Sequence, residues 1–197
     1  KFGLPEKLFS KVVKPGTVCG SFLPSLSEEF GGINPKVISV AAHDTGSAVL
    51  AVPAKSEKFI WISSGTWSIM GTETKEPQIS EKSSMYNFTN EGGIDYRFRF
   101  LKNIMGMWML QCIHKEIGKI HTFAEMAQMA AESDYADYVD AADNRFLAPE
   151  SMVEAFDKAL QRKPESIRDY FRCAYRSLAR SYRQAIEELE LENSNNN

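Results

Sequence analysis

The fold is decided by the stretch Phe59-Ile-Trp-Ile-Ser-Ser-Gly-Thr-Trp-Ser-Ile-Met-Gly71. Two apolar runs flank the small residues Ser63-Ser-Gly65, and this pattern is typical of two strands joined by a tight turn. Further along the chain, residues 96–100 alternate aromatic side chains with Arg, which indicates a half-exposed strand. We therefore expect strands at 59–63, 66–71 and 94–100, all in the same sheet.

Beyond this sheet the apolar spacing becomes helical. From Ile104 onward, apolar residues recur at intervals of three and four, as they do on one face of an amphipathic helix. Thr122, with Glu125 three positions later, has the pattern of a capping box at a helix N-terminus. We expect helices at 104–118, 122–132, 149–161 and from 165 to about 190, the last one packed on the sheet. Strands followed by such helices predict an α/β fold.

The part of the chain before the hairpin is less regular. Residues 1–35 are rich in Pro and Gly, which favours loops, and residues 36–42 form an apolar run typical of a strand buried on both faces of a sheet. A short helix is expected at 47–52, ended by Pro53. The charged stretch 55–58 marks the boundary of a predicted division into 1–54, 58–192 and a frayed tail at 193–197.

Composition excludes several classes of protein. The 197 residues carry a net charge of −3 with both signs interspersed, which argues against a nucleic-acid binder. The three cysteines are odd in number and far apart in sequence, so they favour neither a disulfide scaffold nor a zinc site, and they fit the reducing cytoplasm. No apolar run approaches the roughly 20 residues of a membrane helix. We expect a cytoplasmic protein without a nucleic-acid or membrane partner.

The first polar cluster that could carry chemistry is His43-Asp44-Thr45-Gly46, between an expected strand and an expected helix. Ligand contacts in α/β folds usually lie at the ends of strands. A carboxylate there can accept the proton that a sugar hydroxyl loses when it attacks phosphorus. Asp also caps helices well, and the local pattern by itself favours a capping role for Asp44.

Two further clusters follow. Ser63-Ser-Gly-Thr66-Trp67 could present backbone N–H groups and a hydroxyl to phosphate oxygens, but by itself it favours an ordinary hairpin turn. Asn103 lies where the next helix is expected to begin, so an N-cap role is the simplest interpretation. Gln111 falls near the apolar face of that helix, and its amide therefore requires a partner, either a protein group or a ligand.

The order of these clusters changes their interpretation. The chain resembles the rhamnulokinase branch of the FGGY carbohydrate-kinase family in four strings, which are His43-Asp-Thr-Gly-Ser-Ala-Val49, Ile62-Ser-Ser-Gly-Thr-Trp-Ser68, Phe88-Thr-Asn-Glu-Gly-Gly93 and Arg99-Phe-Leu-Lys-Asn-Ile-Met-Gly-Met-Trp108. The resemblance implies an actin-like (ribonuclease H-like) ATPase lobe with a mixed sheet flanked by helices. It also implies transfer of the γ-phosphoryl group of ATP, with Mg²⁺, to the 1-hydroxyl of L-rhamnulose in rhamnose catabolism.

The resemblance also implies roles for single residues. Asp44 matches the catalytic base and a substrate contact, His43 and Thr45 match sugar contacts, and Asn103 matches a substrate contact. Thr66 and Gln111 match contacts to ATP. No residue here matches the family's glycine-rich phosphate hairpin with its metal-linked Asp, or its Gly-Gly-Gly adenosine turn. We therefore expect a fragment that is inactive by itself, with its metal ligands unknown.

Other functions remain open. Another ketose kinase of the family, such as an L-fuculokinase or a xylulokinase, would share most of these residues, although other members usually have Gly-Asp where this chain has His43-Asp44. A sugar- or nucleotide-sensing module on the same fold would not need a base at Asp44. A hydrolase using Ser63 or Ser64 with His43 and Asp44 would lack the usual nucleophile-elbow sequence. The sequence does not indicate an oligomeric state.

Overall fold

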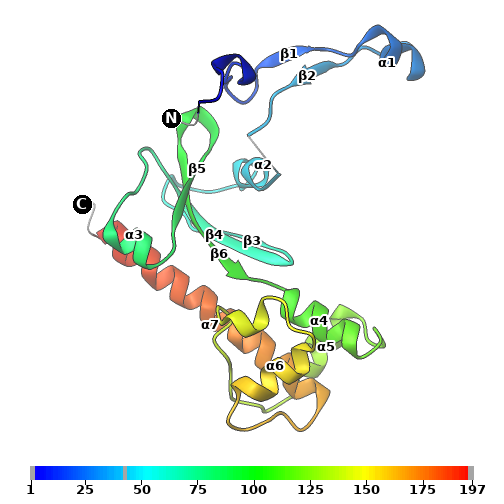
Figure 1. Cartoon of the computed structure of the whole chain (residues 1–197), viewed down its shortest axis with the longest axis vertical. Helices are drawn as coiled ribbons and strands as arrows, with labels where there is room; N and C mark the ends of the chain where they lie inside the picture. Colours follow the sequence, from blue (N-terminus) through cyan, green and yellow to red (C-terminus); the bar gives the residue numbers. More distant parts are fainter. Residues whose placement is uncertain (1–2, 42–43, 195–197) are drawn as a thin grey trace.

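The computed structural model describes residues 3–41 and 44–194. Its helices and strands follow one another along the chain as shown in Figure 1: η1 Glu6–Leu8, β1 Val18–Ser21, α1 Pro24–Glu29, β2 Lys36–Ile38, α2 Asp44–Leu50, β3 Trp61–Ser64, β4 Trp67–Thr74, α3 Glu81–Met85, β5 Thr89–Gly92, η2 Ile94–Tyr96, β6 Phe98–Met105, α4 Trp108–Glu116, α5 Phe123–Ala131, η3 Asn144–Phe146, α6 Met152–Ala159 and α7 Ile167–Ser194. Within these ranges, no helix combines the length and apolar character needed to cross a membrane.

The central sheet has the strand order β3-β4-β6-β5, and each neighbouring pair is antiparallel. The expected hairpin is confirmed, with Ser64 opposite Ser68 and the turn at Gly65 and Thr66. The third strand lies later than expected, because 94–96 form a 3₁₀ turn and β6 runs on to Met105. The helix expected from Ile104 was therefore wrong at its start. Pairing with β4 along the whole of β6 outweighs the helical apolar spacing, which is ambiguous in short runs.

The segment Thr89-Asn-Glu-Gly-Gly93 has the polar and glycine-rich composition of a turn, yet most of it is a strand. Its first four residues form strand β5, in which Thr89 lies opposite Leu101 and Gly92 opposite Phe98. The turn follows, closed by a hydrogen bond from the Gly93 N–H to the carbonyl of Arg97 (2.8 Å). Long-range pairing with β6 thus decides the structure of a segment whose composition favours turns.

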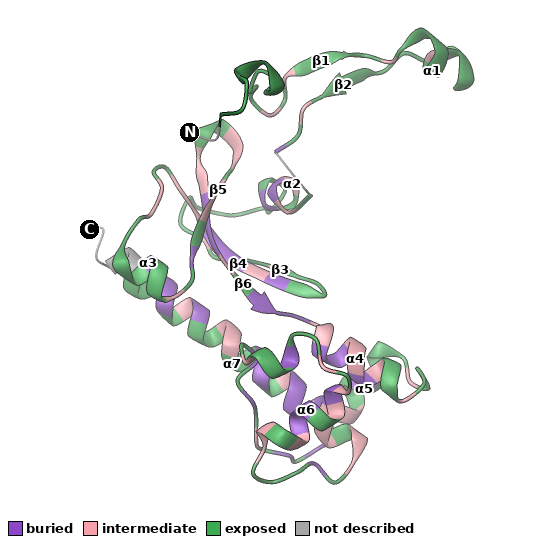
Figure 2. Ribbon diagram, in the orientation of Figure 1, coloured by how far each residue is buried: buried purple, intermediate pink, exposed green. Residues whose placement is uncertain are grey.

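Helix α7 covers one face of the sheet, as predicted. Met70, Phe100 and Ile104 of the sheet pack against Ala185 and Leu189 of the helix. In Figure 2, buried stretches are visible on β4, β6 and α7. Farther toward its N-terminus, the same helix packs against α4, α5 and α6 in a second apolar cluster. The long helix therefore joins the sheet to the helical part of the chain.

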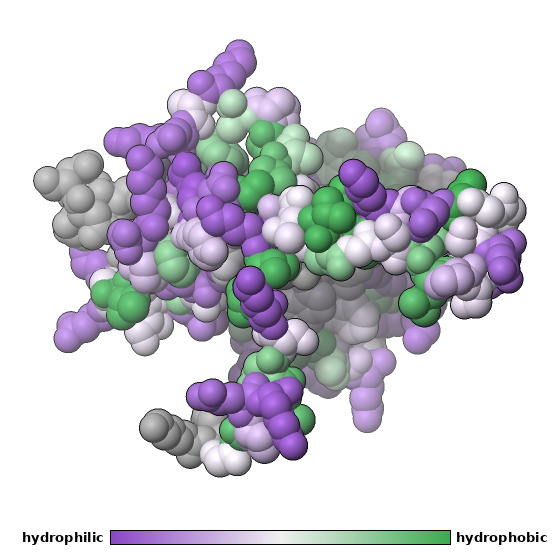
Figure 3. Space-filling model, turned by 90° about the horizontal axis from the view of Figure 1, so that it is seen from above, coloured by the Kyte–Doolittle hydropathy of each residue, from purple (hydrophilic) through white to green (hydrophobic). Residues whose placement is uncertain are grey.

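The residues before the sheet form an antiparallel ribbon of β1 and β2 with α1 at its end, so 1–35 is not purely loop. The strand expected at 36–42 was wrong in length and burial, because β2 ends at Ile38, whose side chain is 52% exposed. Ala42 lies outside the described residues. A strand is buried only when layers cover its faces, and no described element covers β2. The view from above in Figure 3 shows apolar side chains at this surface.

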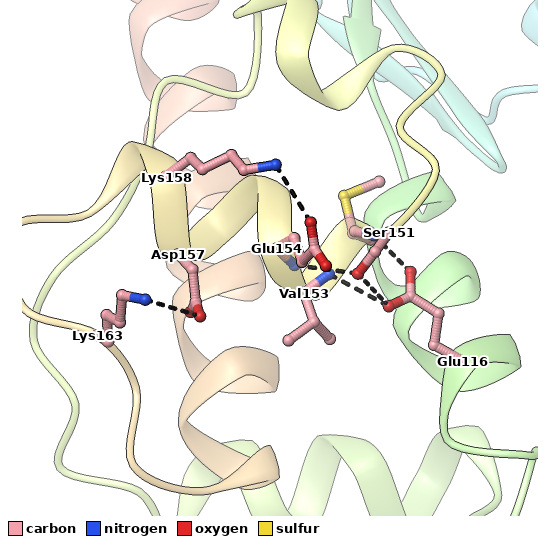
Figure 4. Close-up of polar contacts among 8 residues, drawn as sticks. Glu116, Ser151, Val153, Glu154, Asp157, Lys158 and Lys163 are labelled. Atoms are coloured by element: carbon pink, nitrogen blue, oxygen red, sulfur yellow. Dashed lines mark hydrogen bonds and ion pairs between the residues drawn. The ribbon is translucent and has the colours of Figure 1, made fainter.

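The helical part is ordered by caps that the sequence partly predicted. Thr122 and Glu125 form the expected capping box at the start of α5. Helix α6 is shorter than expected and begins after Ser151. The carboxylate of Glu116, at the end of α4, accepts hydrogen bonds from the Ser151 hydroxyl (2.9 Å) and from the amides of Met152 and Val153, as Figure 4 shows in part. A negative charge at a helix N-terminus is stabilising, so this contact fixes α4 relative to α6.

Candidate functional site

Asp44 is the first residue of α2, and its side chain is exposed. The helix starts three residues earlier than the expected 47–52, and it ends at Leu50. The carboxylate Oδ1 accepts a hydrogen bond from the Thr45 backbone N–H at 2.6 Å, and it lies 3.4 Å from the Thr45 hydroxyl. His43, the expected sugar contact before it, lies outside the described residues. An exposed carboxylate in a first helical turn is compatible with both capping and proton transfer.

Helix α2 is seated on the face of the sheet opposite α7. Val49 is buried in a small apolar cluster with Trp61 of β3 and Leu101 of β6. Near its start, Gly46 is buried, and a Cβ atom there would clash with the backbone carbonyl oxygen of Ala41 and lie 2.5 Å from Arg99 Nη1. A larger residue at position 46 would force a shift of the Ala41 backbone as well as of the Arg99 side chain, so both fit closely against the first turn of α2. These contacts place the candidate base over the sheet.

The tip of the β3–β4 hairpin brings the two expected ATP contacts together. The Gln111 side-chain amide donates a hydrogen bond to the Thr66 hydroxyl at 3.2 Å. The Met107 and Trp108 amides donate to the carbonyls of Gly65 (2.9 Å) and Thr66 (3.1 Å). The partner that Gln111 requires is therefore Thr66, from a turn that is distant in sequence.

Gly106 permits this contact between the hairpin tip and the start of α4. A Cβ atom at position 106 would lie 2.5 Å from the Gly65 carbonyl oxygen and 2.7 Å from the Thr66 carbonyl oxygen. Because both obstructing atoms belong to the backbone, neither can rotate away as a flexible side chain would. Glycine at this position therefore sets the spacing between Thr66 and Gln111.

Gln111 also borders a cavity of about 640 Å³, within the usual range for small-molecule sites. Trp108, Lys115, Lys119 and Phe123 contribute to its walls. Cys112 lines it as well. Burial first, and then the negative charge of Glu116, raise the pKa of the Cys112 thiol above its ordinary value. Cys112 therefore lacks the lowered pKa of a reactive cysteine, and the cavity offers a binding site rather than a thiolate nucleophile.

Asn103 lies elsewhere than expected. It occupies β6, opposite Ile69, so the N-cap interpretation was wrong. Its side chain is exposed, and the residue lines a cavity of about 300 Å³ together with Trp67 and the polar residues Asp140 and Gln184. The structure thus brings Thr66 to Gln111 and leaves Asn103 at a separate cavity.

A Mg²⁺ site needs several oxygen ligands, which in proteins are mainly carboxylates. Within residues 3–41 and 44–194, no group of three or more His, Cys, Asp or Glu side chains is close enough to hold a metal ion. The described residues therefore do not form a metal site by themselves, and we assign none of them as a metal ligand.

One buried charge near the candidate base was missed by the sequence analysis. Arg99 was expected on a half-exposed strand, yet its side chain is only 1% exposed. The signal that could have found it is Glu91, an acidic residue in the segment that turned out to be β5. Opposite charges on neighbouring antiparallel strands often pair, but only the strand assignment makes these two residues neighbours.

The sequence of the chain matches a known protein family and curated relatives. Residues 60–196 match the C-terminal domain of the FGGY family of carbohydrate kinases. The chain is 45% identical to a rhamnulokinase of Oceanobacillus iheyensis over 194 residues, which are 96% of this chain and 41% of that protein. It is 38% identical to a rhamnulokinase of Halalkalibacterium halodurans, over 95% of this chain and 41% of that protein. The chain thus spans about two-fifths of the length of these curated relatives.

Solved structures of low identity share the fold. A xylulose kinase from Rhodospirillum rubrum superposes with a TM-score of 0.61 at 13% identity, over 90% of this chain and 36% of that chain. A kinase from Brucella ovis, described as a xyloylose kinase, gives a TM-score of 0.64 at 14% identity, over 96% and 40% of the two chains. The α/β fold class with an actin-like ATPase lobe is confirmed.

Proposed function

The chain belongs to the FGGY family of carbohydrate kinases, and from this premise we propose that it is part of an ATP-dependent kinase that phosphorylates the 1-hydroxyl of L-rhamnulose. The observation that carries the proposal is the exposed carboxylate of Asp44 at the start of a helix that is seated on the sheet. The name rhamnulokinase, carried by the two curated relatives described above, supports the choice of sugar. Because the chain spans about two-fifths of these relatives, we propose the activity for the whole kinase that contains it.

In this proposal Asp44 accepts the proton of the attacking sugar hydroxyl. Removing this proton makes the oxygen a better nucleophile toward the γ-phosphorus of ATP. His43, Thr45 and Asn103 contact the sugar, and Thr66 and Gln111 contact ATP. Mg²⁺ accompanies ATP in phosphoryl transfer and neutralises charge on its phosphates, but no described residue is assigned to hold it.

We further propose that residues 1–54 end one domain of the kinase, that 58–192 begin the next, and that 193–197 form a tail. The exposed apolar side chains of the N-terminal ribbon support this division, since such surfaces usually pack against another layer. We place the kinase in the cytoplasm, in keeping with the three free cysteines of this chain. Its substrates are a ketose and ATP, without a nucleic-acid or membrane partner.

The experiment that tests this function is an acceptor panel on the whole kinase, containing L-rhamnulose, L-fuculose, D-xylulose, L-ribulose and glycerol. We expect the highest kcat/KM for L-rhamnulose, measured by ATP-dependent formation of the sugar phosphate. A higher kcat/KM for another ketose would contradict the choice of sugar and favour another kinase of the family. Binding of sugar and ATP without any product would instead favour a sensing module.

A second test concerns the two ATP contacts. Thr66→Ala and Gln111→Ala in the whole kinase should each raise the KM for ATP about ten- to a hundredfold, with the KM for the sugar unchanged. The reason is that a hydrogen bond to a charged group contributes about 1.5–3 kcal/mol. Steady-state kinetics with each substrate varied in turn would measure both constants.

The matched control for this test is Gln128→Ala, which removes an exposed amide that donates to Glu132, the residue that ends the same helix. It should leave both KM values unchanged. Because Thr66 and Gln111 bond to each other, the double variant should lose less than the sum of the single losses. A rise in the sugar KM alone would contradict the assignment of that residue, and thermal melting would reveal a merely structural effect.

A further inference from the structure

Arg99 carries a buried charge that is paired on one side with strand β5. Its side chain is 1% exposed, and its Nη2 donates to Glu91 Oε2 at 3.2 Å and to the Gly92 carbonyl oxygen at 3.0 Å. Burying a guanidinium group is costly unless it is paired and hydrogen-bonded. Both acceptors lie on β5, so this short edge strand holds the guanidinium in one orientation.

The other side of the same guanidinium lies against α2. At Gly46, a Cβ atom would lie 2.5 Å from Arg99 Nη1 and 3.0 Å from its Cζ. Gly46 is two residues after Asp44, in the first turn of α2. The planar guanidinium thus lies between β5 and the first turn of α2, which carries the candidate base, and it contacts both.

Among the described residues, α2 contacts the sheet near both of its ends. Val49, near the end of the helix, packs in the apolar cluster with Trp61 and Leu101, whereas the start of the helix rests on the buried charge of Arg99. Apolar contacts tolerate small sliding movements, but a guanidinium held by a carboxylate and a carbonyl has a defined direction. The first turn of α2 therefore fits against the Arg99 guanidinium as well as against the Ala41 carbonyl oxygen.

We propose that Arg99, held by Glu91, is a positioning residue that fixes the first turn of α2 and with it the carboxylate of Asp44. The inference rests on the proposed function of Asp44 as the base. It gives a role to the Thr89-Asn-Glu-Gly92 strand, which the proposed function left without one. It is consistent with glycine at position 46, where the Ala41 carbonyl oxygen and the Arg99 guanidinium together leave no room for a Cβ atom.

The test uses Glu91→Gln and Arg99→Lys in the whole kinase, because both variants keep the size and polarity of the side chain. We expect kcat to fall about ten- to a hundredfold, since misplacing a reacting group by about 1 Å can cost a hundredfold. The KM for ATP should stay unchanged. Hydrogen–deuterium exchange of the amides of residues 45–50 should become faster in both variants.

The matched control is Glu188→Gln, which breaks the other ion pair of β6. Glu188 binds Lys102 at 2.6 Å on the face of the strand that packs against α7, and it is also buried. This variant should lower the melting temperature and leave kcat and the exchange of residues 45–50 unchanged. A purely structural role of Arg99 would make Glu91→Gln behave in the same way as Glu188→Gln.

The outcomes separate this inference from the proposed function. If Asp44→Asn is inactive while Glu91→Gln and Arg99→Lys keep the parent kcat, the inference is overturned and the function stands. If the parent phosphorylates no sugar, the function fails, and the exchange measurement still decides the positioning role. Unchanged exchange at residues 45–50 in both variants would overturn the inference in either case.

Discussion

Asp44→Asn in the whole kinase should lower kcat for L-rhamnulose phosphorylation by about 10²–10⁴-fold, the usual contribution of a positioned general base. Asn has nearly the same shape as Asp but does not accept the proton of the sugar hydroxyl. The exposed position of Asp44 at the start of α2 leaves its carboxylate accessible to a substrate. Steady-state kinetics would give kcat, and equilibrium binding would show that ATP and sugar still bind.

Substitutions of Asp44 also distinguish a catalytic role from a helix-capping role. Asp44 accepts a hydrogen bond from the Thr45 amide, and an Asn oxygen can accept it as well. A role limited to capping predicts a normal kcat in Asp44→Asn and a stability loss of about 1 kcal/mol in Asp44→Ala. If Asp44→Asn phosphorylates L-rhamnulose within a few-fold of the parent rate, the proposed mechanism is wrong at its centre and the sensing module becomes the better hypothesis.

Phe156→Ala should lower the free energy of unfolding by about 3–5 kcal/mol, as is usual when a fully buried Phe is truncated. Phe156 is 0% exposed, and its ring lies 5.1 Å from that of Phe146 and 6.2 Å from that of Tyr170. It therefore sits at the centre of the helical cluster that supports α4. Urea denaturation followed by circular dichroism would measure the loss.

Phe123→Ala is the matched control, because this Phe is 47% exposed and contacts only the ring of His114 among the aromatic residues described. It should lose about 0.5–1.5 kcal/mol at most, the contribution of one aromatic pair. At low temperature, folded Phe156→Ala should keep the parent kcat, in contrast to Asp44→Asn. A loss below about 1 kcal/mol in Phe156→Ala would show that the cluster collapses around the cavity or packs less tightly than the structure indicates.

The sequence by itself determined the features that depend on neighbouring residues. The hairpin of 59–71 follows from two apolar runs around Ser63-Ser-Gly65, and the start of α5 follows from Thr122 and Glu125. The four family-like strings identified the fold class and the kind of enzyme. For the hairpin and the helix cap, the deciding interactions join residues that are close along the chain. For the family resemblance, the four strings together are long enough to be specific.

Only the tertiary structure decided where distant segments meet. Met105 belongs to β6 because Trp67 pairs with it, although the apolar spacing around it is helical. Gln111 finds its partner in Thr66, 45 positions earlier in the chain. Arg99 is buried because Glu91 and Gly46 approach it from two elements. The free energy of each of these contacts depends on partners that only folding brings together. A short stretch of sequence therefore does not predict the contact.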